Sequence, residues 1–126
     1  MHSLPMIAVR SVGASSQWYA GLLRCTVENV AEDFARLTSD GRVLLLLHAW
    51  DAEEHGAWEG VPGVHVGSGF VLWFVVDDFD GVCARARELE AEILVEPHEN
   101  LEDGVREFTL RDRDGYTLAI IEESAR

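Results

Sequence analysis

The feature that most constrains the fold is a pair of extended runs joined by a tight turn near the end of the chain, in Phe108–Glu123. The turn centres on Asp114-Gly115, and glycine accepts the positive φ that a tight hairpin turn demands. A strand places successive side chains of the second run on opposite faces. One face would carry Thr117, Ala119 and Ile121, and the other Leu118, Ile120 and Glu122.

This hairpin has a counterpart in the first half of the chain. Asp40-Gly41 followed by Val43–Leu47 matches Asp114-Gly115 followed by Thr117–Ile121, 74 positions later. Each half has the order strand, helix and three strands, so the sequence predicts an α+β fold of two βαβββ repeats. In the first half we expect strands at 6–12, 25–30, 34–38 and 42–50, and a helix at 17–23 that follows turn and cap residues at 13–16. In the second half we expect strands at 70–76, 93–95, 105–111 and 116–123, and a helix from Asp77 or Asp78 to about Glu90.

A single domain is expected, because 126 residues match the size of one domain. Its parts would be a first unit at 1–50, a linker loop at 51–69 and a second unit at 70–126. The linker holds five glycines and a proline, together with several acids, Trp58, His55 and His65. This composition is typical of a loop, and such a loop could act as a lid.

The charge of the chain argues against nucleic acid as a partner. The formal net charge is −13, from 23 acidic and 10 basic residues, and phosphates would be repelled. The acidity serves either solubility or the attraction of a cationic molecule. No apolar run approaches the roughly 20 residues that span a bilayer, and the N-terminus does not look like a secretory signal. With only Cys25 and Cys83 as thiols, the expectation is a cytoplasmic protein without a membrane partner.

Three short motifs resemble those of one superfamily. They are Trp18-Tyr19 in the first helix, the strand exit Val76-Asp77-Asp78, and Arg111–Tyr116 with its Asp-x-Asp-Gly turn. With the order of elements, they make the chain similar to the vicinal oxygen chelate superfamily, which includes glyoxalase I, extradiol dioxygenases, and fosfomycin and bleomycin resistance proteins. The similarity covers nearly the whole chain, although Arg113 replaces the usual proline of the turn. It implies the glyoxalase/bleomycin resistance fold, with cupped mixed sheets.

The same resemblance implies where a divalent metal would be bound. Enzymes of the superfamily place His, Gln or Glu at four strand positions, which fall here near Leu4 or Pro5, near Leu46, near Val71 and at Ala119. None of these side chains has a nitrogen or oxygen donor. His48 lies two residues past the second position on the same face, and Glu122 lies past the fourth on the wrong face. We therefore expect no metal and no other cofactor.

The chain then resembles the metal-free bleomycin resistance branch, whose members are acidic homodimers that sequester a cationic antibiotic. Ligand-binding candidates include Leu46, Val71 and Ala119 at the metal positions. Trp50 and Trp73 on the strands of the cup and Trp58 in the linker could stack on a planar or cationic ligand. Trp18 is expected in the core, and Trp50 and Trp73 could also be core residues.

Polar candidates complete the expected site. His48 would point with Leu46 and Trp50 into the cup as a hydrogen-bonding group. Glu107 shares a face with Thr109, and it is the best candidate carboxylate for a bound cation, unless it faces solvent. Neither cysteine has a histidine at a sequence spacing that indicates a catalytic Cys–His pair, so the sequence does not indicate nucleophilic catalysis.

Three functions remain open on the sequence. The first is a metal-free, homodimeric protein that binds a small molecule, as in the sequestration of a drug. The second is a metal-dependent lyase, isomerase or dioxygenase with a displaced site around His48, His65 and an acid. The third is a protein-interaction or regulatory module whose cup is filled by its own side chains.

Overall fold

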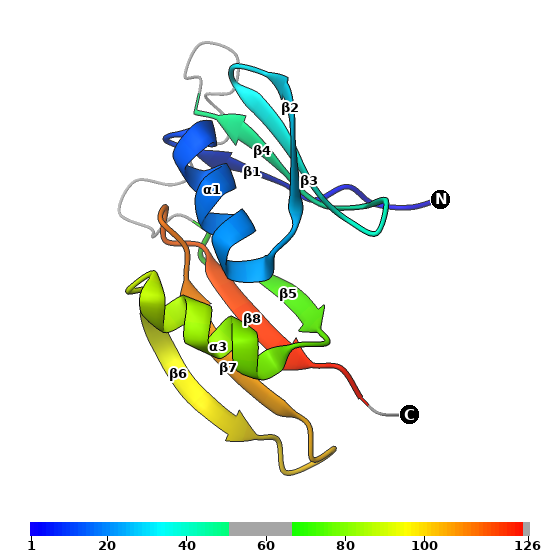
Figure 1. The fold of residues 1–126 in the computed structure, drawn as a ribbon, viewed down its shortest axis with the longest axis vertical. Helices are drawn as coiled ribbons and strands as arrows, with labels where there is room; N and C mark the ends of the chain where they lie inside the picture. The colour runs from blue at the N-terminus through cyan, green and yellow to red at the C-terminus, as the bar shows by residue number, and fades with distance from the viewer. Residues whose placement is uncertain (51–66, 125–126) are drawn as a thin grey trace. The chain divides into compact units, whose positions relative to one another are not determined.

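The computed structural model describes residues 1–50 and 67–124. The chain divides into two compact units, Met1–Pro62 and Gly63–Arg126. Each has one helix on one side of a four-stranded sheet (Figure 1). Within the described residues, no helix is both long and apolar enough to cross a membrane.

The first unit has the predicted βαβββ order. Its sheet runs β1-β4-β3-β2, with β1 parallel to β4 and the other neighbours antiparallel. The elements are β1 (Met6–Val9), α1 (Val12–Leu23), β2 (Thr26–Ala31), β3 (Phe34–Ser39) and β4 (Arg42–Ala49).

The second unit repeats this topology. Its sheet runs β5-β8-β7-β6, with β5 parallel to β8. The two mixed sheets confirm the predicted α+β fold of two βαβββ repeats. The elements are β5 (Val71–Val76), α3 (Phe79–Glu88), β6 (Glu92–Glu99), β7 (Arg106–Arg111) and β8 (Thr117–Glu122).

Both helices begin with the same cap geometry. The Ser11 hydroxyl accepts a hydrogen bond from the Ala14 N–H at 3.2 Å, and an Asp78 carboxylate oxygen accepts one from the Gly81 N–H at 3.1 Å. The prediction of an Asp78 cap is therefore correct. The predicted start of the first helix, after residue 16, is wrong. Ser11 caps the helix five residues earlier, because its side chain accepts a hydrogen bond from a free N–H of the first turn. The preceding strand therefore ends at Val9.

Each core lies between the helix and the sheet face that the helix covers. In the first unit, Tyr19 and Leu22 of α1 are fully buried with alternate residues of the strands, including Leu45 and Leu47. In the second, the rings of Phe79 and Phe108 meet edge to face at 5.6 Å between centroids. The fully buried strand residues of this second core are Phe108, Leu110, Leu118 and Ile120.

Strand β6 is longer than the predicted 93–95. It continues to Glu99 and includes Pro97, which we expected in a loop. Because β6 lies at the edge of its sheet, Pro97 can occupy it without breaking a ladder on both sides.

The two units correspond position by position, but not at the single spacing that the sequence indicated. Equivalent hydrogen bonds run from the Trp50 N–H to the Val9 carbonyl at 3.0 Å and from the Glu123 N–H to the Val76 carbonyl at 2.8 Å. The first strands are thus 67 positions apart and the last strands 73.

The predicted spacing of 74 fits the glycines of the turns and is wrong for the strands. The register shifts between Leu37, which pairs with Leu45, and Thr38, which pairs with Val43. This bulge adds one residue to β4, and one residue turns a side chain to the other face of a sheet.

Candidate functional site

The face of the second sheet opposite α3 carries most of the predicted ligand-binding residues that the structure describes. We call it the second open face. Strand register places three rows of side chains across it, in the order β5, β8, β7, β6. The rows are Val71, Thr117, Arg111 and Glu92; Trp73, Ala119, Thr109 and Val95; and Val75, Ile121, Glu107 and His98.

Trp73 is the most exposed aromatic side chain on this face. It is 65% exposed, so it does not fill the core of the second unit. Val71 and Val75, on either side of it along β5, are also more than half exposed. The neighbouring position across the sheet is Ala119, whose small side chain leaves room beside the indole. The result is an apolar stripe with a flat aromatic surface available for contact.

Glu107 and Thr109 lie on the second open face, on the strand next to Ala119. The Glu107 carboxylate is held by His98, whose Nε2 lies 3.1 Å from Glu107 Oε1. The other ring nitrogen of His98, Nδ1, lies 2.9 Å from the Glu96 carbonyl oxygen. The sequence did not single out His98, because β6 was expected to end at residue 95. Alternation continued from Val95 would have placed His98 on the opposite face, and the register shift between Val95 and His98 brings it to this one.

Glu122 lies on the opposite side of β8, as its position in the alternation predicted. Arg106 donates to one Glu122 oxygen from Nε at 3.1 Å and from a terminal guanidinium nitrogen at 2.6 Å. It also donates to Asp80 at 2.8 Å and lies 4.8 Å from the centre of the Phe79 ring.

These contacts stabilise the charged forms of Glu122 and Arg106. The hydrogen bond from Arg106 lowers the pKa of Glu122, and the hydrogen bonds to Glu122 and Asp80 raise the pKa of Arg106. Glu122 therefore serves as the counter-ion of Arg106 and points away from the second open face.

A cavity of about 430 Å³ lies beside this network in the second unit. Four of its six lining residues have ionisable side chains, in contrast to the apolar stripe around Trp73. It is lined by Pro97, His98, Glu99, Gly104, Arg106 and Glu122.

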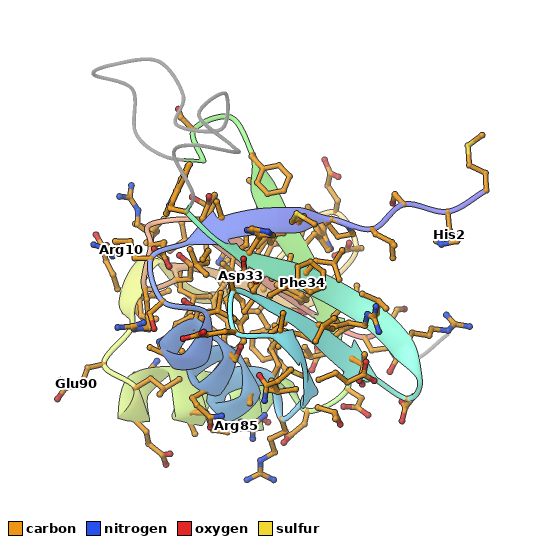
Figure 2. The ribbon with its side chains drawn as sticks, turned by 90° about the horizontal axis from the view of Figure 1, so that it is seen from above. His2, Arg10, Asp33, Phe34, Arg85 and Glu90 are labelled. Atoms are coloured by element: carbon orange, nitrogen blue, oxygen red, sulfur yellow. The ribbon has the colours of Figure 1, made fainter. Side chains whose placement is uncertain are left out.

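The corresponding face of the first sheet, the first open face, contains Leu46 and His48. Leu46 pairs with Met6 and is buried, and His48 pairs with Phe34. The Phe34 ring, at the start of β3 next to Asp33 (Figure 2), meets the His48 ring edge to face at 5.9 Å between centroids. His48 Nδ1 lies 2.8 Å from the Ala49 carbonyl oxygen. His48 and Leu46 thus share the face on which the sequence placed them.

Trp50 follows β4 and is half-buried. Trp58, His55 and His65 lie outside the residues that the structure describes. Trp18 is buried with Tyr19 in the first unit, as expected, with 5.1 Å between the two ring centroids.

The described residues do not fit the divalent metal that the resemblance implies. At the spacings of 67 and 73, Leu4 corresponds to Val71 and Leu46 to Ala119, so the four positions form two equivalent pairs. All four side chains are hydrocarbon and cannot bind a cation. Across 1–50 and 67–124, no group of three or more His, Cys, Asp or Glu side chains is arranged to hold a metal ion.

The cysteines are poor candidates for a nucleophile. Cys25 and Cys83 are free thiols of intermediate exposure. Burial raises the pKa of each above its ordinary value and so favours the unreactive thiol form.

Several solved structures have the same fold. A protein of unknown function from Agrobacterium tumefaciens is 18% identical with a TM-score of 0.78, over 98% of this chain and 94% of that one. A glyoxalase/bleomycin resistance protein/dioxygenase family enzyme from Burkholderia phytofirmans is 17% identical with a TM-score of 0.76, over 95% and 96%. The fosfomycin resistance protein FosX from Mesorhizobium loti is 13% identical with a TM-score of 0.71, over 99% and 93%. At these identities the likeness concerns the fold alone.

Curated proteins give no significant match to the sequence. The family model described as Glyoxalase/Bleomycin resistance protein/Dioxygenase superfamily matches residues 3–120, which is nearly the whole chain. The chain therefore belongs to the glyoxalase/bleomycin resistance protein/dioxygenase superfamily.

Proposed function

We propose that this protein binds a planar, aromatic and cationic small molecule on the second open face and holds it without a resident metal. The observation that carries the proposal is Trp73, a large aromatic side chain that is 65% exposed on a sheet face. Ala119 and Thr109 continue its row, and Glu107 lies in the adjacent row. An indole surface, a small neighbour and a carboxylate match the three needs of such a ligand.

The physical argument favours binding over chemistry. Stacking and cation–π contact with Trp73 would contribute about 0.5–2 kcal/mol beyond the apolar area buried. The metal positions Leu46, Val71 and Ala119 offer no donor with which to polarise a substrate oxygen. Sequestration of an antibiotic-like ligand is the role that the bleomycin resistance branch suggests, and the net charge of −13 favours a cationic guest.

Calorimetric titration with a panel of cationic planar dyes tests the proposal. We expect Trp73→Ala to weaken binding by about tenfold or more, because it removes the stacking surface. Met6→Ala is the matched control, since Met6 occupies the equivalent position of the first unit and should not matter. The proposal would be contradicted if no dye of the panel bound the wild type, or if the wild type and Trp73→Ala bound the dyes with equal affinity.

Two properties of the assembly remain predictions. The resemblance suggests a homodimer, and the presence of only two cysteines suggests the cytoplasm. Sedimentation equilibrium should give the mass of a dimer. A monomer at micromolar concentration would remove this part of the proposal.

A second candidate function is a metal-dependent enzyme with a displaced site. It is favoured by His48, which lies on the first open face two residues from Leu46. In that case His48→Ala should abolish the uptake of a divalent metal measured by elemental analysis. Uptake that is absent from the wild type, or unchanged in the variant, would eliminate this candidate.

A further inference from the structure

His98 limits how the Glu107 carboxylate can receive a ligand. The two residues pair across β6 and β7 and lie on the second open face. His98 Nε2 is 3.1 Å from Glu107 Oε1, and the other ring nitrogen, Nδ1, lies 2.9 Å from the Glu96 carbonyl oxygen. The ring thus approaches Glu107 from the edge strand β6 and pairs with one of its two oxygens.

The cross-strand neighbours of Glu107 on the side away from His98 are apolar. The neighbour on its other side is Ile121 of β8, followed by Val75 of β5. Arg106 and Arg111, the nearest arginines along β7, are engaged elsewhere: Arg106 binds Glu122 and Asp80, and Arg111 Nε lies 4.0 Å from Glu92. Among the described residues, His98 is the one side chain that pairs with the Glu107 carboxylate.

We infer that His98 is a specificity-determining residue, which makes Glu107 a one-oxygen acceptor and thereby selects the class of cation. A guanidinium or amidinium group binds a carboxylate best through two parallel hydrogen bonds, which need both oxygens. A primary or secondary ammonium needs only one acceptor. The second open face therefore favours an arylalkyl ammonium over an aryl amidinium of similar shape. This inference rests on the proposed function, because Trp73 supplies the aromatic contact.

Two probes of matched shape test the inference, 2-naphthylmethylamine and 2-naphthamidine. We expect the wild type to bind the amine more tightly than the amidine. His98→Ala frees the second oxygen, so the ratio of the two dissociation constants should move toward the amidine by about tenfold. His98→Gln keeps a hydrogen-bond donor near Glu107 and should restore part of the wild-type ratio.

Glu107→Gln and Glu92→Gln are the charge controls. Glu107→Gln should weaken both probes, whereas Glu92→Gln removes a charge from the same face, in the Val71 row, and should leave the ratio unchanged. A ratio that is the same in the wild type, His98→Ala and His98→Gln would overturn the inference while leaving the proposed function intact. If neither probe nor any dye of the panel binds the wild type, the proposed function fails and the inference fails with it.

Discussion

The two units share a scaffold and differ on the sheet face that the helix leaves uncovered. On the helix side, both units bury alternate aliphatic residues of the strands and cap the helix with an oxygen that binds the third following N–H. On the first open face, the central positions hold a buried Leu46 and His48 against Phe34. On the second, Ala119 takes the place of Leu46, and Trp73, which is 65% exposed, takes the place of Met6, which is 40% exposed. The Glu107–His98 pair lies nearby.

This difference shows which part of a βαβββ unit its topology constrains. The helix side must exclude water for the unit to fold, so its residues are fixed in size and polarity. The open face contributes little to that core and can diverge. Exposure of a residue as large as Trp73 is therefore not explained by packing, whereas packing accounts for the leucines of the helix side.

The largest expected effect tests the equivalence of the helix sides. Leu47 and Ile120 occupy the same position at the spacing of 73, and both are fully buried. Leu47→Ala and Ile120→Ala should each cost about 2–5 kcal/mol of the free energy of unfolding, because each leaves a cavity in a closed core. Urea unfolding measures both. A cost below about 1 kcal/mol at one position alone would break the equivalence of the two cores.

A smaller effect is expected at the two hairpin turns. Gly41 has a φ of 77° and Gly115 a φ of 93°, in the left-handed region where a Cβ is strained. Gly41→Ala and Gly115→Ala should each cost about 1–2 kcal/mol.

Gly13 is the matched control for this strain, because it lies in α1 without a positive φ and an added Cβ meets nothing within 4 Å. Gly13→Ala should stabilise the first unit by up to about 1 kcal/mol. If all three substitutions destabilise equally, the conformation of the turns is not the cause.

The sequence predicted the fold well, because its strongest signals are local. Asp-Gly turns, the Asp78 cap and the alternation of β8 each depend on neighbouring residues. The errors arose where pairing decides the outcome. The bulge that turns Leu46 to the open face depends on how β3 pairs with β4, and no residue type in β4 indicates a bulge.

The same limit applies to the candidate site. Shared faces followed from alternation, which placed Glu107 with Thr109. The contact of His98 with Glu107 could not be predicted, because it requires the β6–β7 register with its two shifts. The sequence also left open whether Trp73 is exposed, because a tryptophan on a strand can lie on the buried face or on the solvent face of the sheet.

Acid should affect the second unit more than the first. The pKa of Glu122 is lowered from 4.5 by the hydrogen bond from Arg106, and the equivalent residue of the first unit is Ala49. A carboxylate with a lowered folded-state pKa stabilises the protein above its unfolded-state pKa, and this stabilisation disappears as the pH falls through the folded-state value.

Denaturant unfolding between pH 7 and pH 3 measures the effect. Glu122→Gln should reduce the loss of stability below about pH 4.5, with its main cost at neutral pH, where the ion pair with Arg106 is lost. Glu28→Gln, which removes an exposed partner of Arg36 in the first unit, is the control. An acid profile that is the same in wild type and Glu122→Gln would show that the Arg106 network does not set it.

The smallest expected effect concerns a polar atom inside the first unit. Ser16 is 1% exposed, and its hydroxyl has no hydrogen-bond partner among the residues that the structure describes. The equivalent residue in α3, 67 positions later, is Cys83, a weaker hydrogen-bonding group. A buried hydroxyl that has lost its water without gaining a partner weakens the folded state, so Ser16→Ala should leave stability unchanged or raise it by up to about 1 kcal/mol.

Ser16→Cys should have the same effect on stability if the cysteine of α3 indicates which side chains this position tolerates. A loss of more than about 1 kcal/mol in Ser16→Ala would contradict the prediction, because it would mean that the hydroxyl stabilises the folded state of the first unit.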